Sequence, residues 1–199
     1  YAAMAYAQAS DGMSACLVST GCAATNAVTA ALCAWQDNVP VIFISGQHML
    51  NETTHHTKCS IRTYGSQEAD IVSIVKSITK YAVMISDPDQ VVYEMEKAIA
   101  IALSGRKGPV WIDVPLDIQN ARVNPVCLPR YQEKDQIYDE ILLDSCVTDS
   151  VVQALSSAER PILLLGGGVR SARAELLAAE FAERIQIPVV FSPSGPDIY

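Results

Sequence analysis

Apolar segments with the composition of β-strands alternate along the chain with segments of helical periodicity. The clearest strand segment, residues 41–45, reads Val-Ile-Phe-Ile-Ser and follows a helical segment at residues 24–35. A near-continuous apolar run of this kind is typical of a strand in a parallel sheet that helices cover on both faces. The alternation therefore predicts an α/β fold with a parallel sheet.

The same pattern recurs up to the last residues. Helices are expected at residues 2–10, 24–35, 86–103, 147–158 and 172–184, and strands at residues 14–20, 41–45, 110–114, 161–166 and 188–192. Between them, residues 121–145 carry prolines and charges without sustained periodicity, so we interpret this stretch as a linker. We expect one domain at residues 1–120 and a second, doubly wound and Rossmann-like, at residues 146–199, where the sheet looks truncated.

Charge and hydropathy exclude several classes of partner. The net charge of −8 and the pI of about 4.8 argue against a surface that binds nucleic acid. No apolar run is long enough to cross a bilayer and no secretory signal opens the sequence, so a cytoplasmic protein is expected. The six cysteines form no CxxC pair and no histidine falls at zinc-ligand spacing, which predicts no metal site and reduced, mostly buried thiols.

A polar loop lies between the first strand and the second helix. It reads Ser19-Thr20-Gly21-Cys22-Ala23-Ala24-Thr25-Asn26, and loops in this position present backbone N–H groups to ligands in open α/β sheets. The plain alternative is a strand-to-helix connection, with glycine serving the turn and Thr25 or Asn26 serving as cap. Local spacing alone favours the plain alternative.

A glycine-rich turn follows the strand of the second domain. Gly166, Gly167 and Gly168 precede Arg170 between a strand and a helix, where such a turn can cradle the phosphates of a nucleotide such as FAD. The full GxGxxG spacing is absent. A turn that lets helix and strand pack closely is an equally good interpretation.

The longer context of the first loop resembles one enzyme family. The segment from Ser19 through AVTAALCAWQDNVPVIFISGQ is similar to the SGPGATN, helix, strand and SGQ succession of acetolactate synthases, which are thiamine diphosphate-dependent. The similarity continues through Tyr64–Ile71, Ile78–Tyr81, Ser104–Val110 and Asp113–Pro115 in family order. The GGGVR segment is similar to the family's central domain, so the resemblance covers nearly the whole chain.

This resemblance implies a fold, a cofactor and a set of site residues. The first domain would be the thiamine-diphosphate-binding pyrimidine domain, with the second the start of the central domain. Thr20, Gly21, Cys22 and Asn26 would line the aminopyrimidine side, and Gln67 would reach the substrate. The glutamate that activates the cofactor would lie before Tyr1, and the GDG motif that holds Mg²⁺ is absent, so the chain alone should be inactive.

The implied reaction is decarboxylation of a 2-keto acid, with pyruvate as donor, followed by transfer of the two-carbon unit. A keto-sugar acceptor in polysaccharide synthesis is the runner-up, and a non-catalytic nucleotide-binding module or an inactive truncated product is the alternative of another class. Family members assemble as dimers or larger homo-oligomers. Departures from the family pattern occur at Cys22, Ala23 and Leu116, which weakens the assignment of a substrate.

Two neighbouring histidines, His55 and His56, resemble the proton-donating pair of thiamine-dependent decarboxylases. Their surroundings are polar, and the Tyr64–Glu68 sequence matches carboligases. We therefore interpret the two histidines as part of a solvated loop.

Overall fold

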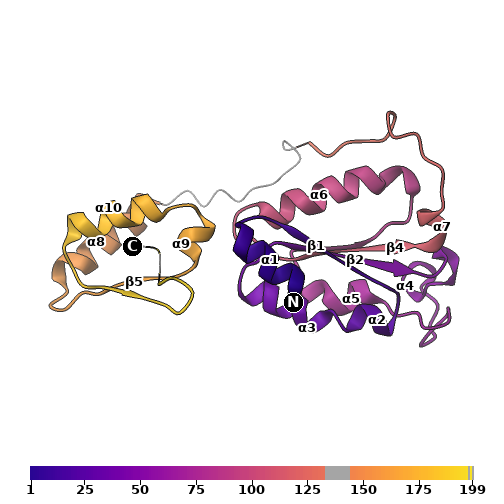
Figure 1. Cartoon of the computed structure of the whole chain (residues 1–199), viewed down its shortest axis with the longest axis horizontal. Helices are drawn as coiled ribbons and strands as arrows, with labels where there is room; N and C mark the ends of the chain where they lie inside the picture. Colours follow the sequence, from indigo (N-terminus) through magenta and orange to yellow (C-terminus); the bar gives the residue numbers. More distant parts are fainter. Residues whose placement is uncertain (133–143, 197, 199) are drawn as a thin grey trace. The chain divides into compact units, whose positions relative to one another are not determined.

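The computed structural model describes residues 1–132, 144–196 and 198. The chain divides into two compact units, Tyr1–Tyr138 and Asp139–Tyr199. Both units contain parallel strands with helices between them, which confirms the α/β fold class (Figure 1). The bounds predicted for the two domains and their linker stay a prediction.

A parallel sheet forms the centre of the first unit. Its strands are β1 (Ser14–Val18), β2 (Val41–Gln47), β3 (Tyr81–Met84) and β4 (Val110–Pro115), and their order in the sheet is β1-β2-β4-β3. The two central strands, β2 and β4, are the most buried strands of this sheet. Their register places Ser45 opposite Asp113, close to the carboxyl ends of both strands.

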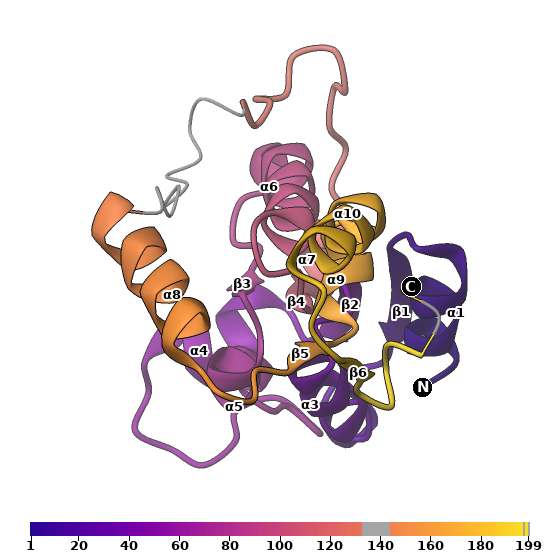
Figure 2. The ribbon, with the colours of Figure 1, turned by 90° about the vertical axis from the view of Figure 1, so that its left-hand side faces the viewer.

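Helices lie on both faces of this sheet (Figures 1 and 2). On one face are α1 (Ala2–Ser10), α2 (Cys22–Thr25), α3 (Val28–Gln36) and α5 (Ile71–Val75), where a core forms around Phe43 and Trp111, whose rings stack with centroids 5.0 Å apart. On the other face α6 (Val91–Leu103) packs small side chains such as Ala98 and Ala102 against the strands. Short elements complete the unit: η1 (Leu50–Glu52), α4 (Thr54–Thr57), η2 (Lys76–Ile78), η3 (Pro88–Gln90) and α7 (Leu116–Gln119).

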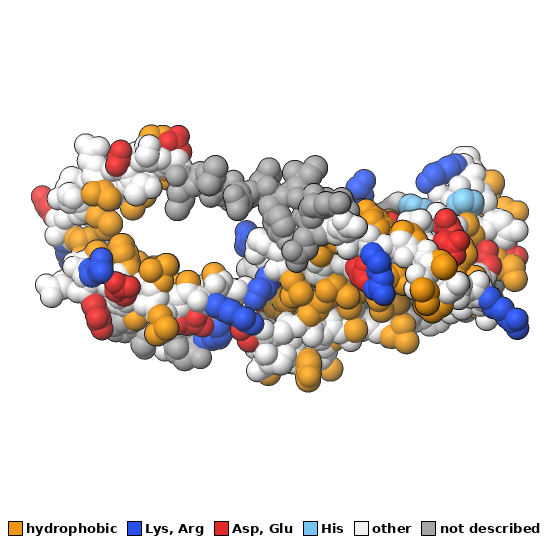
Figure 3. Space-filling view, turned by 90° about the horizontal axis from the view of Figure 1, so that it is seen from above, with side chains coloured by type: hydrophobic (Ala, Val, Ile, Leu, Met, Phe, Trp, Pro, Cys, Tyr) orange, Lys and Arg blue, Asp and Glu red, His pale blue; other side chains and the backbone are white. Residues whose placement is uncertain are grey.

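The edge strand β1 is only partly covered. α6 packs on β2, β3 and β4, and Leu17 of β1 is 79% exposed. Figure 3 looks onto the side of the first unit that carries α6, and hydrophobic side chains are visible across that surface. Residues of β1 alternate between partly buried and exposed, so this strand is covered on one face only.

The second unit contains a two-stranded parallel sheet and three helices among its described residues. Its elements are α8 (Ser145–Ser157), β5 (Leu163–Leu165), α9 (Gly168–Ser171), α10 (Glu175–Ile185) and β6 (Val189–Phe191), and β5 pairs with β6. The predicted order of helix, strand, helix and strand is confirmed here, with the short α9 added before α10.

Three expectations from the sequence need correction. The helix expected at residues 24–35 is two helices, α2 and α3, and the hydroxyl of Thr25 donates back to the carbonyl of Cys22 next to the break. Strand β3 and helix α5 were missed, because segments of four and five residues give too little periodicity to recognise. The thiols are not mostly buried either, since Cys22, Cys59, Cys127 and Cys146 are exposed.

Within the part of the chain that the structure describes, no helix is long and apolar enough to cross a bilayer.

Candidate functional site

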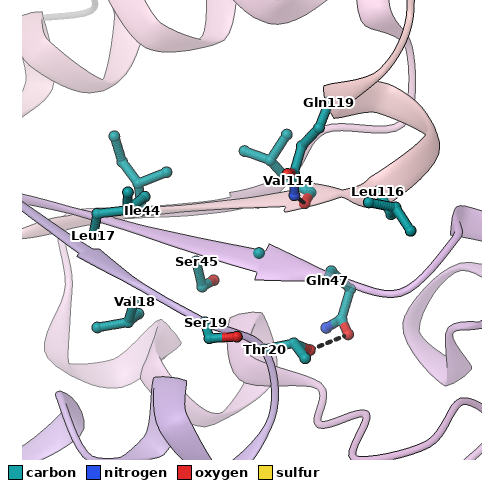
Figure 4. A pocket seen from close by; sticks show the side chains of 11 residues that line it. Leu17, Val18, Ser19, Thr20, Ile44, Ser45, Gln47, Val114, Leu116 and Gln119 are labelled. Carbon is teal, nitrogen blue, oxygen red and sulfur yellow. Dashed lines mark hydrogen bonds between the residues drawn. The ribbon is translucent and has the colours of Figure 1, made fainter.

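A cavity of about 660 Å³ opens at the carboxyl ends of β1, β2 and β4. This edge is where open α/β sheets place their ligands, because the loops that leave parallel strands there spread apart. Figure 4 shows Leu17, Ile44 and Val114 on one side of the sheet, and Ser45 and Gln47 on the other. The lining residues are Leu17, Val18, Ser19, Thr20, Ile44, Ser45, Gly46, Gln47, Val114, Leu116 and Gln119.

The loop that follows β1 meets the loop that precedes α5 through its backbone. Gly21 adopts φ 62° and ψ −125°, a conformation that side chains disfavour, and Gln67 also has a positive φ of 63°. A Cβ atom placed on Gly21 would lie 1.7 Å from the carbonyl oxygen of Gln67. Only glycine allows this contact, which brings two of the expected site residues together.

The other expected residues of the first domain lie differently. Thr20 lines the cavity, whereas Cys22 and Asn26 are exposed residues at the two ends of α2 and are not among the described residues of its lining. Leu116, one of the departures from the family pattern, does line the cavity and is 45% exposed. The aminopyrimidine roles of these residues stay predictions.

A buried polar network lies under the cavity. Asp113 is 1% exposed, its Oδ1 accepts from Ser45 Oγ at 2.5 Å, and its Oδ2 accepts from Gln47 Nε2 at 3.0 Å. The indole Nε1 of Trp111 donates to Ser45 Oγ at 2.9 Å. The Thr20 hydroxyl donates to Gln47 Oε1 at 2.9 Å, as the dashed line in Figure 4 shows. The network thus connects the core to the cavity loop.

The carboxyl of Asp113 carries the most perturbed acid–base equilibrium of the site. Burial raises its pKa to about 7, although the hydrogen bonds from Ser45 and Gln47 favour the charged form, and the charges of Asp70 and Glu68 raise it further. Both protonation states are therefore populated near neutral pH.

The network residues were not singled out by the sequence. Ser45, Gln47 and Asp113 each stand as one polar residue at the end of an apolar strand, and such residues are usually read as the end of the strand. The signal that could have found them is that polar residues stand near the carboxyl ends of two buried strands. If the two strands are adjacent and parallel, these polar groups lie close together and must hydrogen-bond to one another.

The loop at residues 48–70 is held by a second set of contacts. Glu68 is buried and accepts from the backbone N–H of Thr54 and of Tyr64, both at 2.8 Å. His55 Nδ1 lies 2.8 Å from Asp70 Oδ1, so this histidine is paired rather than simply solvated, while His56 is exposed. Burial opposes ionisation of Asp70, but hydrogen bonds from Ser73 and the contact with His55 lower its pKa overall.

In the second unit, the three glycines follow β5 as expected. Gly167 lies close to the loop after β6, since a Cβ on it would approach the carbonyl oxygen of Ser194 to 3.0 Å. This contact supports the close-packing interpretation for Gly167. Gly166, Gly168 and Arg170 lie in or beside α9, and their binding of FAD stays a prediction.

The cavity suits one part of thiamine diphosphate and not the rest. Its apolar walls and the hydroxyl of Thr20 fit a flat ring that carries hydrogen-bonding groups. The described lining contains neither a basic side chain to balance a diphosphate nor a carboxylate for Mg²⁺. No cluster of three potential metal ligands occurs among the described residues. The described lining is therefore compatible with a ring of the aminopyrimidine kind, but not with the diphosphate or Mg²⁺.

Comparison with known proteins gives matches along both units. Residues 1–74 match the family description "Thiamine pyrophosphate enzyme, N-terminal TPP binding domain", and residues 148–199 match "Thiamine pyrophosphate enzyme, central domain". The acetolactate synthase large subunit of Haemophilus influenzae is 32% identical over 195 residues, which are 98% of this chain and 33% of that protein. Chloroplastic acetolactate synthase 2 of Nicotiana tabacum is 33% identical over 201 residues, covering 98% and 28%.

A solved structure has the same fold. It is an X-ray structure of a protein from Mycobacterium smegmatis, with a TM-score of 0.76 and 22% identity over 96% of this chain and 34% of that one. The chain spans about a third of the length of the curated relatives it matches. Both matching descriptions are of thiamine pyrophosphate enzymes, and the N-terminal domain match precedes the central domain match along the chain. This chain therefore belongs to the thiamine pyrophosphate enzyme family.

Proposed function

We propose that the protein containing this chain is a thiamine diphosphate-dependent carboligase of the acetolactate synthase type. It decarboxylates pyruvate or a related 2-keto acid and transfers the remaining two-carbon unit to a second carbonyl compound. Support comes from the acetolactate synthase relatives, which match 98% of this chain. The observation that carries the proposal is the contact of Gly21 with Gln67 beside a cavity lined by Thr20.

The chain's own residues would bind and orient the aminopyrimidine ring. The hydroxyl of Thr20 donates its hydrogen to Gln47 Oε1, which leaves the hydroxyl oxygen able to accept a hydrogen bond from an amino group of a ligand. Leu17, Ile44 and Val114 would exclude water from the ring face. When bound, thiamine diphosphate supplies a nucleophilic carbon and accommodates the electron pair released by decarboxylation.

Other features of the complete protein follow from the family resemblance. We propose that residues other than those described here hold the diphosphate and Mg²⁺, and that the protein forms a dimer or larger homo-oligomer. FAD and a cytoplasmic location stay predictions.

One observation favours the second candidate acceptor. Leu116 lines the cavity where family members frequently carry lysine, so the described lining offers no cation to a second 2-keto acid. A keto-sugar has no carboxylate to pair. The wall at Leu116 therefore suits transfer to a keto-sugar better than transfer to a second pyruvate.

The test is an assay of the complete protein with pyruvate, thiamine diphosphate and Mg²⁺, with either excess pyruvate or a keto-sugar as acceptor. We expect pyruvate to be consumed and its two-carbon unit to appear in a product formed with the acceptor. Failure to consume any 2-keto acid would contradict the proposal. Leu116→Lys should shift product toward acetolactate, while Leu116→Met, which keeps the wall apolar, should not.

A further inference from the structure

The directions of the hydrogen bonds around Gln47 are set by its backbone partners. Its Oε1 accepts from the N–H of His48 at 3.0 Å, and its Nε2 donates to the carbonyl of Ala69 at 3.0 Å. A backbone N–H can only donate and a carbonyl can only accept, so the amide cannot turn over without breaking both bonds. The second hydrogen of Nε2 is therefore available for Asp113 Oδ2.

The direction at Ser45 is set in the same way. The indole N–H of Trp111 can only donate, so Ser45 Oγ accepts from it and gives its own hydrogen to Asp113 Oδ1. Both oxygens of Asp113 consequently accept hydrogen bonds, and the ionised carboxylate satisfies every neighbouring donor. A proton on Oδ1 would face the Ser45 hydroxyl, and a proton on Oδ2 would face the Gln47 amide. A proton on Oδ2 displaces the Gln47 amide, whereas a proton on Oδ1 turns the Ser45 hydroxyl hydrogen away and leaves Gln47 bonded to a neutral oxygen, which is a weaker acceptor.

The surroundings make this change accessible. The charged groups that act on Asp113 are the carboxylates of Glu68 and Asp70, which disfavour its negative charge, as does its burial. Asp70 is itself paired with His55. Gln47, the neighbour on the Oδ2 side, also accepts from the hydroxyl of Thr20 in the cavity loop.

We propose that Asp113 is a positioning residue of the cavity: its carboxylate holds the Gln47 amide, which fixes the Thr20 hydroxyl and the Ser19–Gly21 loop, and loss of the charge releases that loop. The effect concerns the shape of the cavity. It does not depend on which ligand the cavity takes, so it stands or falls separately from the proposed carboligase activity.

Nuclear magnetic resonance of the ¹⁵N-labelled 199-residue chain, titrated between pH 5 and pH 9, tests the proposal. The indole N–H of Trp111 reports one end of the network, and the backbone amides of Thr20 and Gly21 report the other. A Trp35→Phe variant assigns the indole signal. All three signals are expected to shift with one shared midpoint near the Asp113 value of about 7.

Two variants separate positioning from mere support of the fold. Asp113→Asn removes the titrating group and should abolish the shared shift, leaving the Gly21 signal at its low-pH position at every pH. Thr20→Val removes only the hydrogen bond between residue 20 and Gln47. In it Trp111 should still titrate, while the Gly21 amide no longer follows. If Asp113→Asn does not fold, the Thr20→Val comparison decides alone.

Histidine side chains in general change charge in this pH range, so His48 and His55 are each replaced by asparagine as a control. The shared midpoint should survive in both variants. If the Trp111 signal titrates while the Thr20 and Gly21 signals do not shift, the proposal is overturned, because the change of charge at Asp113 then has no effect on the cavity loop. A loop shift that persists in Asp113→Asn or vanishes in either histidine variant would overturn it as well.

Discussion

At Gly21 two loops that lie 46 residues apart in sequence touch through their backbones, so the side chain of any other residue has no room. Gly21→Ala should lower the free energy of unfolding by at least about 2 kcal/mol, because a Cβ meets the Gln67 carbonyl and the φ angle becomes strained. Urea unfolding followed by circular dichroism measures the loss.

Gly105 provides a matched control for this variant. It also has a positive φ, of 49°, but a Cβ there meets nothing within 4 Å. Gly105→Ala should therefore cost only the backbone strain, about 1 kcal/mol. Equal losses in the two variants would contradict the contact between Gly21 and Gln67.

The raised pKa of Asp113 predicts a pH dependence of stability. Its folded pKa of about 7 lies above the unfolded value of about 3.9, so between these values the folded state retains a proton that the unfolded state has released. The contribution is fully present below the unfolded pKa and is lost as pH rises through the folded pKa.

The measurement is the free energy of unfolding of the wild type minus that of Asp113→Asn, which cannot titrate there. This difference should fall steadily between pH 5 and pH 8. A difference that rises over this range would show that the carboxylate, despite its burial, is stabilised by folding.

The sequence located part of the site, and the limits have physical reasons. A loop after the first strand was expected to bind, and Thr20 does line a cavity there, because strand ends in parallel sheets form such edges. The exposure of Cys22 and Asn26 depends on where α2 breaks, which spacing does not reveal. The partners of Asp113 lie 66 and 68 residues away and depend on the strand register.

At the scale of the elements, Asp70 joins a helix to its preceding loop. Its carboxylate accepts from the backbone N–H of Ser73 at 3.1 Å, as the N-cap of α5, and contacts His55 at the same time. Asp70→Ala should cost about 1 kcal/mol of unfolding free energy, since a cap lost at a helix N-terminus costs that much.

Asp70→Asn separates the two contacts. Asparagine is as good a cap as aspartate, so this variant should stay within a few tenths of a kcal/mol of the wild type. A larger loss would mean that the contact with His55 contributes more than partly exposed pairs usually do. Thermal unfolding at pH 6 and pH 8 compares the three proteins.

Long or strongly apolar elements were predictable, and short ones were not. The strands at residues 41–45 and 110–114 stand out because they are central in the sheet and buried on both faces. β3 has only four residues, and three of them are only partly buried, so its sequence shows no clear pattern of buried apolar positions. The connection between α2 and α3 depends on backbone hydrogen bonds that no side-chain pattern encodes.

At the scale of the whole molecule, the exposed edge strand β1 carries the clearest consequence for behaviour in solution. Leu17 is 79% exposed on a strand whose outer edge has no partner strand among the described residues, and such a surface favours association between copies. Leu17→Lys should reduce self-association of the 199-residue chain, as measured by sedimentation velocity over a range of concentrations.

Val126→Lys adds the same charge elsewhere, at a residue that is 90% exposed in a turn. It should leave self-association unchanged. A similar reduction in both variants would mean that net charge, rather than the β1 edge, governs association.

The strand order β1-β2-β4-β3 also dictates when the sheet can assemble during synthesis. Among the described strands of the first unit, β3 pairs with β4 alone, and β4 is the last of them to leave the ribosome. Until Val110–Pro115 has emerged, β3 has no neighbour and β2 lacks one of its two partners. Because every pairing in this sheet joins strands that are distant in sequence, the nascent chain exposes apolar strands for longer than a chain of hairpins would, and chaperones have that interval in which to bind it.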